Sequence, residues 1–277
     1  MHGASHELSA ADRDLRIDAG PATGVMSQLA DTDILLFERG PQAGECLHGL
    51  LESIDFTDPQ SWPPAIQAAL RRTRGLPLGE QMLQGMLQNL LNTALPFGTT
   101  NPLRLADLPL DRRLTELEFH LTCAGLRDRD LNRVLRSQGY PGLRLGFAPL
   151  QGFLKGFIDL VFEHEGRYFV LDWKSNHLGN YPADYGRAQM SAEMTRHAYH
   201  LQSLLYCVAL DRYLRQRIAG YDRQHHFGGS VYLFVRAVRP NWVLDDGSPA
   251  GVYFDRPSDA LIDELDSLLA GGGRGNA

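Results

Sequence analysis

The pattern of apolar and polar residues is clearest in two runs, 154–163 and 167–173, both rich in aromatic and β-branched side chains. Glu165-Gly166 lies between them and suits a two-residue turn, so the pattern predicts a β-hairpin. A two-residue loop also sets the register, because the position numbers of directly paired residues must then sum to 331.

In this register His164 faces Arg167, and Asp159 faces Asp172 on one side of the sheet. Lys174 lies two residues beyond Asp172, so it points to the same side. Directly opposed like charges destabilise a hairpin, and a bound divalent cation is the simplest compensation. A salt-bridged hairpin is the structural alternative, and a one-residue change of register would separate the two acids.

Elsewhere the spacing of apolar residues alternates between that of helices and that of strands. Helical spacing is found in residues 43–54, 62–95, 187–219 and 260–269, and strand-like patterns in residues 114–121, 230–238 and 251–254. We expect a folded region over residues 34–270. Residues 1–33 have little periodicity and are expected to be a linker or flexible segment, and residues 271–277 a disordered tail.

Composition draws attention to the predicted hairpin a second time. Lys155 and Lys174 are the only lysines among the 27 basic residues, so a chain that otherwise uses arginine has a lysine beside the acidic pair. Lysine is a compact ammonium and arginine a planar, permanently charged group, so the two are not interchangeable in a reaction centre. This bias favours a functional site over a salt-bridged hairpin.

Bulk properties exclude several classes of protein. A chain of 277 residues with 43% hydrophobic content fits a soluble globular protein, and no apolar run approaches the ~20 residues of a membrane span. No secretion signal is recognisable and the three cysteines are widely separated, so we expect reduced thiols and a cytoplasmic location. No GxxxxGK[ST] phosphate loop is present, so we expect no ATP site in this chain.

The net charge of −6 is unfavourable for DNA binding, but the charge is unevenly distributed. Between Arg187 and Arg239 there are eight arginines against Glu193, Asp211 and Asp222, a local balance of +5. A local basic surface beside an acidic metal site can still hold a phosphate backbone. We therefore expect a basic surface in this region, and modest affinity of the chain alone for DNA.

Several motifs resemble those of a known family. Asp159 followed by Asp172-Trp173-Lys174 resembles the signature of PD-(D/E)xK nucleases, although a D-x-K triplet alone is a weak signal. The chain as a whole resembles the C-terminal nuclease domains of RecB, the exodeoxyribonuclease V beta subunit, over most of residues 34–270. The segments that carry this resemblance, in order along the chain, are residues 155–162, 225–229 and 232–236.

The resemblance implies an α/β fold with a restriction-endonuclease-like core, in which a central mixed β-sheet is flanked by helices. It implies an Mg²⁺-dependent DNA nuclease, exonuclease or endonuclease, acting mainly on single-stranded DNA that a RecBCD-type helicase supplies. Such an enzyme would serve double-strand-break repair, recombination and degradation of linear DNA. Implied partners are RecC-like and RecD-like subunits and a helicase portion outside this chain.

The resemblance also implies that Mn²⁺ can replace Mg²⁺, and that Ca²⁺ binds without supporting turnover. One alternative is a non-catalytic nuclease-fold module for DNA binding or subunit docking, and another is a metal-dependent hydrolase that acts on a different phosphodiester. Loss of Asp159, Asp172 or Lys174 would mark such a module, and all three are present.

By the same resemblance Asp159, Asp172 and His48 are metal ligands. His48 follows Leu47 in an Arg-Gly…Gly…Leu-His context that matches the family. Lys174 would orient the attacking water and stabilise developing negative charge. We favour this role over that of a general base, because the adjacent carboxylates stabilise its charged form.

Three further residues are assigned to the site by resemblance. Glu116 matches the Glu-x-x-Phe motif and would be a further acidic group, although Glu118 lies on the same face of the predicted strand. Gln202 and Tyr206 match a Gln-x-x-x-Tyr motif that lines the catalytic cleft in the family. We expect these two to position DNA or the attacking water.

Overall fold

The structure is a computed structural model that describes residues 5–7, 29–71, 78–140 and 145–271. Most of the expected N-terminal linker (residues 1–33) and of the expected tail (residues 271–277) lies outside these ranges. In the described part, no helix is long and apolar enough to span a membrane.

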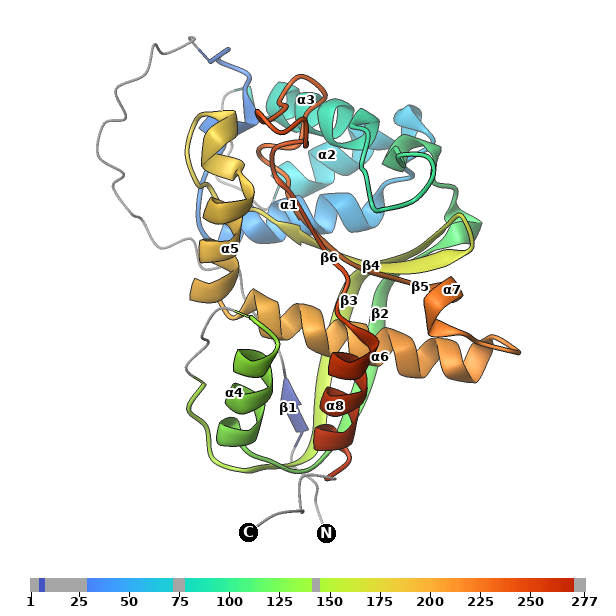
Figure 1. Cartoon of the computed structure of the whole chain (residues 1–277). Coiled ribbons are helices and arrows are strands. Elements are labelled where there is room, and N and C mark those ends of the chain that lie inside the picture. Colours follow the sequence, from blue (N-terminus) through green and yellow to red (C-terminus); the bar gives the residue numbers. More distant parts are fainter. Residues whose placement is uncertain (1–4, 8–28, 72–77, 141–144, 272–277) are drawn as a thin grey trace.

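A mixed β-sheet runs through the centre of the fold (Figure 1). Its strands follow the order β1-β3-β4-β5-β6, and β2 pairs with the other edge of β3. The pair β4–β5 is parallel and the pairs β2–β3, β3–β4 and β5–β6 are antiparallel, which confirms the expected α/β fold with a mixed sheet. The strands are β1 Ser5–Glu7, β2 Arg113–Leu126, β3 Leu150–His164, β4 Arg167–Lys174, β5 Phe227–Phe234 and β6 Val252–Asp255.

Helices cover both faces of the sheet (Figure 1). The α-helices are α1 Pro41–Ser53, α2 Trp62–Leu70, α3 Gly79–Asn92, α4 Asp128–Ser137, α5 Arg187–Arg196, α6 Tyr199–Arg217, α7 Arg223–His226 and α8 Asp259–Leu269. Short 3₁₀ turns are formed by Ile34–Leu36, Pro59–Ser61, Leu105–Asp107, Leu110–Arg112 and Pro182–Tyr185.

In the described ranges, three buried hydrophobic clusters hold these layers together, and the two largest lie on opposite faces of the sheet. One core packs α1, α2 and α3 against alternate residues of the central strands, such as Leu171 and Leu233. The other packs α4, α6 and α8 against the opposite face, which includes Val170. Because side chains alternate along a strand, Asp172 and Lys174 point to the same face as Val170, towards α6.

The hairpin predicted from the sequence is confirmed. Glu165 and Gly166 have φ angles of 51° and 76°, so both adopt the left-handed conformation of a two-residue hairpin turn. His164 pairs with Arg167, and the same register continues to the pair Leu160–Leu171. The two aspartates follow at the next position of each strand.

The strands β2 and β3 change direction at the position of Asp159. Before it, Ile158 packs into the core beneath α6, and after it Val161 does, whereas Leu160 packs against the α1–α3 layer. Along β3, the side chains that face α6 are therefore at even positions before Asp159 and at odd positions after it. On β2 the residue opposite Asp159 is Glu116, which has a φ of 50°. The residues on either side of Glu116 pair regularly with β3. A left-handed backbone at a non-glycine residue is strained.

Three predicted elements are divided or displaced. The helical pattern over residues 62–95 forms two helices, since α2 ends at Leu70 and α3 begins at Gly79. The helical pattern over residues 187–219 forms two helices, α5 and α6, because the chain turns at Ala198, where φ is 57°. The strand predicted for residues 230–238 starts earlier, at Phe227, and ends at Phe234. The break at Ala198 matters for the site, since it sets where α6 begins above the sheet.

Candidate active site

Strands β3 and β4 bring two carboxylates and a lysine together. The backbone N–H of Trp173 donates a hydrogen bond to the Asp159 carboxylate at 2.9 Å, which ties Asp159 to the strand that carries Asp172. The Lys174 ammonium lies 2.5 Å from the carboxylate of Asp172. Both Asp172 and Lys174 are only 2% exposed, so their ion pair is sealed from bulk water.

The two carboxylates influence each other. Burial, and then the charge of Asp172, raise the pKa of Asp159 above its usual range. The positive charges of His48 and Lys174 act in the opposite direction. Two acids held this closely in a low-dielectric setting are stabilised by any cation placed between them.

His48 reaches the same place from the other layer of helices. Helix α1 buries Leu47 and Leu51 in the core below the sheet, as its apolar spacing predicts, and His48 lies beside that stripe. The Nδ1 atom of His48 lies 3.5 Å from the Asp159 carboxylate. Helix α1 thus contributes a nitrogen donor next to the two carboxylates.

A cage of polar and aromatic groups holds the Lys174 ammonium. It lies 3.8 Å from the ring centre of Tyr199 and 5.3 Å from that of Tyr232, and it donates to Oε1 of Gln202 at 3.4 Å. The Tyr232 hydroxyl donates to the same Gln202 oxygen at 3.1 Å. Aromatic faces and a carboxylate favour the charged form of the amine, so the cage suits an electrostatic role.

Tyr206 completes the wall formed by α6. Nε2 of Gln202 donates to its hydroxyl at 2.9 Å, and the spacing of four residues places both side chains on one face of the helix. Burial raises the pKa of Tyr206 and Tyr232 well above the usual value, and the charge of Asp172 is the next cause for each. Both phenols are therefore protonated at neutral pH.

Tyr199 and Tyr232 were not among the expected site residues. Tyr232 pairs in register with Asp172 across the parallel strands β4 and β5, a neighbour that depends on the long crossover through α5 and α6. The pattern of residues along either strand does not predict this pairing between β4 and β5. Tyr199 belongs to a stripe of tyrosines along the predicted helix, which is a weak signal because such stripes are usually packing.

Glu116 stands apart from the other expected residues. It is exposed, and among the described residues no hydrogen bond or ion pair joins it to Asp159, Asp172 or Lys174. Its register position beside Asp159 and its left-handed backbone are the features that connect it to the site. Glu118 instead pairs with His120 and with Lys155, at 2.7 and 3.2 Å.

The donor atoms suit a hard divalent cation in their chemistry. Two carboxylates and an imidazole are ligands that such ions accept. Burial and then the charge of Asp172 raise the pKa of Asp159, and a bound cation would offset both effects. In the ranges that the structure describes, no three His, Cys, Asp or Glu side chains are clustered tightly enough to form a complete metal site. The Lys174 ammonium instead balances the charge of Asp172.

We expected a basic surface between Arg187 and Arg239, but most arginines of this region bind carboxylates or carbonyls of the protein itself. Arg239 pairs with Asp33 at 2.7 Å, and buried Arg236 donates to four backbone carbonyls. Three others pair with carboxylates of α6 and α8. These three are Arg212, Arg215 and Arg223, and their partners are Asp211, Asp263 and Asp266. This part of the prediction was wrong, because the positive charges stabilise the fold.

Comparisons with known proteins give a family match and several related proteins. A family profile described as the PD-(D/E)XK nuclease superfamily matches residues 28–271. The chain is 38% identical over 283 residues to the RecBCD enzyme subunit RecB of Escherichia coli, which covers 98% of this chain and 22% of that protein.

Two further relatives are RecBCD enzyme subunits RecB from other bacteria. The Haemophilus influenzae protein is 35% identical over 86% of this chain and 19% of its own length, and the Mycobacterium tuberculosis protein 34% identical over 83% and 24%. The chain thus spans about a fifth of the length of the curated relatives it matches.

Proposed function

The chain belongs to the PD-(D/E)XK nuclease superfamily, and from this membership and the site geometry we propose that it is a metal-dependent DNA nuclease domain. One observation carries the proposal. Strands β3 and β4 bring the carboxylates of Asp159 and Asp172 together with the ammonium of Lys174, and α1 adds the imidazole of His48. These are the group types that phosphodiester hydrolysis at a divalent cation requires.

Each residue has a role in this proposal. Asp159, Asp172 and His48 would hold Mg²⁺, which when bound neutralises phosphate charge and activates water. Lys174, held in place by its cage, orients the attacking water and stabilises the negative charge that develops on the phosphate. Gln202 fixes the ammonium, and Tyr206 fixes Gln202. Glu116 would act from the exposed side, where the substrate arrives.

The substrate and partners form the wider part of the proposal. The relatives are named as RecB subunits of the RecBCD enzyme. By analogy, this chain would cleave single-stranded DNA, by exonuclease or endonuclease action, as a helicase portion delivers it. It would work beside RecC-like and RecD-like subunits in the cytoplasm, during double-strand-break repair. Mn²⁺ would replace Mg²⁺, and Ca²⁺ would bind without turnover.

The experiment uses end-labelled linear and circular single-stranded DNA, with Mg²⁺ or with EDTA. The wild-type protein should degrade DNA only with Mg²⁺, and cutting of the circle would show that it needs no end. Asp172→Asn and Asp159→Asn should abolish cleavage. Asp111→Asn, which removes an exposed carboxylate from another part of the chain, should cleave like the wild type.

The outcomes separate the proposal from its alternative. A wild-type protein that binds DNA but is inert with both Mg²⁺ and Mn²⁺ would be a non-catalytic DNA-binding or docking module. Cleavage that persists in folded Asp172→Asn and Asp159→Asn proteins would place the reaction outside the β3–β4 site.

A further inference from the structure

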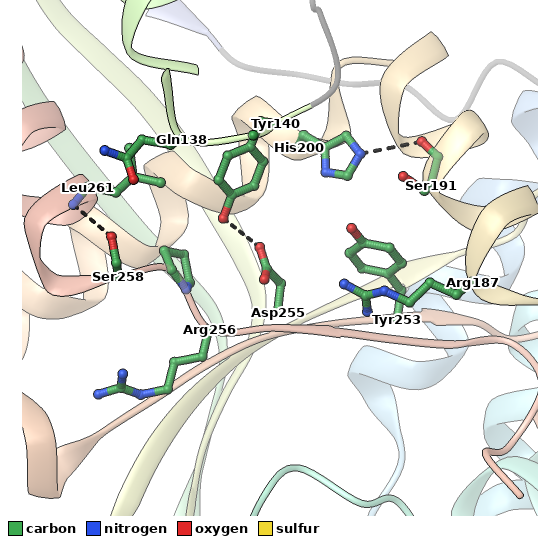
Figure 2. A pocket seen from close by; sticks show the side chains of 12 residues that line it. Gln138, Tyr140, Arg187, Ser191, His200, Tyr253, Asp255, Arg256, Ser258 and Leu261 are labelled. Atoms are coloured by element: carbon green, nitrogen blue, oxygen red, sulfur yellow. Dashed lines mark hydrogen bonds between the residues drawn. The ribbon is translucent and has the colours of Figure 1, made fainter. Parts of the chain in front are cut away.

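A cavity of about 430 Å³ lies against the first turn of α6, where His200 is one of its lining residues (Figure 2). Its walls come from the segment after α4, from α5, from the start of α6, from the end of β6 and from the loop leading into α8. Ligand pockets in proteins have volumes of roughly 300–1,000 Å³. The cavity therefore has room for a group the size of one nucleotide.

Three rings from distant parts of the chain surround this space (Figure 2). The ring of His200 lies 5.9 Å from that of Tyr140 and 5.7 Å from that of Tyr253 between centroids, with both pairs edge to face. Burial lowers the pKa of His200, so its ring is neutral at neutral pH. His200 is 2% and Tyr253 5% exposed, so a base would stack on the half-buried ring of Tyr140, with the other two rings behind it. Aromatic faces bind nucleobases by stacking, with little preference for sequence.

Two guanidinium groups add positive charge to the same cavity. Arg187 lies over the Tyr253 ring, 4.2 Å from its centre, and donates to a backbone carbonyl of β6 at 2.7 Å. Arg256 donates to a carbonyl at the start of β5 at 3.3 Å, and lies 3.9 Å from the Asp259 carboxylate. Because carbonyls carry no net charge, Arg187 in particular keeps its charge for an anion, and guanidinium groups bind phosphate well.

The cavity also has an acceptor for the polar edge of a base. The Asp255 carboxylate receives a hydrogen bond from the Tyr140 hydroxyl at 2.7 Å. A carboxylate has about four acceptor positions, so it can also accept from the N–H groups of a base. With Asp259 beside Arg256 and Asp255 at the cavity, the two carboxylates balance the two guanidinium groups, so binding of an anionic ligand depends on Arg187, which contacts a carbonyl and a ring.

We propose that this cavity binds one nucleotide, with its phosphate at Arg187 and Arg256 and its base among Tyr140, His200 and Tyr253. The inference rests on the proposed nuclease function for the source of that nucleotide, which is a unit of the single-stranded substrate outside the bond that is cleaved. Strands β5 and β6 connect the two places. Tyr253 lines the cavity and pairs in register with Tyr232, whose hydroxyl donates to the Gln202 oxygen that holds the Lys174 ammonium. A strand anchored in the cavity is thereby kept beside the reaction centre.

The test measures fluorescence anisotropy of labelled oligothymidylate in EDTA, where cleavage does not interfere. Arg187→Gln removes a cation, and Tyr140→Leu removes a ring. Each should weaken binding about 5-fold or more, the loss expected for one stacked base or one phosphate contact. Arg217→Gln is the matched control, because Arg217 is an exposed arginine of α6 that lies over Tyr213 instead. It should bind as the wild type does.

Competition identifies the source of the nucleotide. If dTMP displaces the oligonucleotide at comparable concentration and inorganic phosphate does not, the cavity takes free nucleotides; displacement only by longer strands supports a substrate unit. If folded Arg187→Gln and Tyr140→Leu proteins bind oligothymidylate as tightly as the wild type, the inference is overturned. It is also overturned if the wild type binds neither oligothymidylate nor dTMP. Nuclease function is tested separately, by Mg²⁺-dependent cleavage. A wild type that does not cleave DNA, but whose binding of oligothymidylate depends on Arg187, would refute only the proposed function.

Discussion

Replacing Lys174 by Met would remove the ammonium that lies 2.5 Å from the Asp172 carboxylate. Both residues are 2% exposed, so water cannot take over the role of the missing partner. Breaking a buried ion pair by removing one member costs about 3–5 kcal/mol. We therefore expect Lys174→Met and Asp172→Asn each to lower the free energy of unfolding by about that amount.

The double variant separates this interaction from the loss of two side chains. With both charges gone, neither partner is left buried and uncompensated, so the combined cost should fall at least about 1 kcal/mol short of the sum. Urea unfolding followed by circular dichroism measures all three variants, in EDTA so that no divalent cation contributes. Asp111→Asn, an exposed carboxylate, should stay within about 0.5 kcal/mol of the wild type. Additive costs would refute the view that the two charges stabilise each other.

Three further predictions concern the core, the pH dependence and the reaction. Gly228→Ala should cost about 1–3 kcal/mol in urea unfolding, because a Cβ there would lie 2.5 Å from the buried Phe169 ring; an unchanged midpoint would contradict this packing. Burial, and then the charge of Arg39, lower the pKa of His177 to about 4. Between about pH 6.5 and pH 4 the unfolded chain therefore binds a proton at His177 that the folded protein does not. The contribution of His177 to stability should be complete above about pH 6.5 and be lost towards pH 4, so His177→Gln should remove this part of the pH dependence; an unchanged profile would exclude it. Gln202→Leu should lower kcat on single-stranded DNA about 10- to 100-fold by displacing the ammonium that it holds, whereas a change confined to KM would point to substrate binding.

The hairpin could be predicted from the sequence because its geometry is set locally. The two-residue turn requires left-handed backbone at both positions, and Glu165 and Gly166 supply it. The turn length then sets the register of β3 and β4. Periodicity was sufficient for this part of the site, and the family resemblance added His48, Gln202 and Tyr206.

The bend of β2 and β3 could not be predicted in the same way. On β2, apolar and polar residues alternate regularly through residues 117–121. On β3, however, the side chains that face α6 change from even to odd positions at Asp159, and Glu116, opposite it on β2, has a left-handed φ. Glutamate has no preference for that conformation, so tertiary packing imposes it. The position of Tyr232 beside Asp172 depends on a crossover between parallel strands, which short-range patterns do not specify.

The arginine-rich region shows why a local charge count can mislead. Arg223 pairs with Asp211 at 2.8 Å and with Asp263 at 2.7 Å, and Asp263 lies 40 residues further along the chain. A count within the window could not include that partner. Arg187 instead lines the cavity beside Tyr253, and only the fold shows this position.

The most direct test of the central claim is the position of a bound metal ion. Crystals of the wild-type protein grown with Mn²⁺ would be measured at a wavelength where manganese scatters anomalously. The account predicts an anomalous peak within coordination distance of the carboxylates of Asp159 and Asp172, with His48 beside it. An absent peak at these residues, in a protein that cleaves single-stranded DNA with Mn²⁺ in the same buffer, would contradict the account.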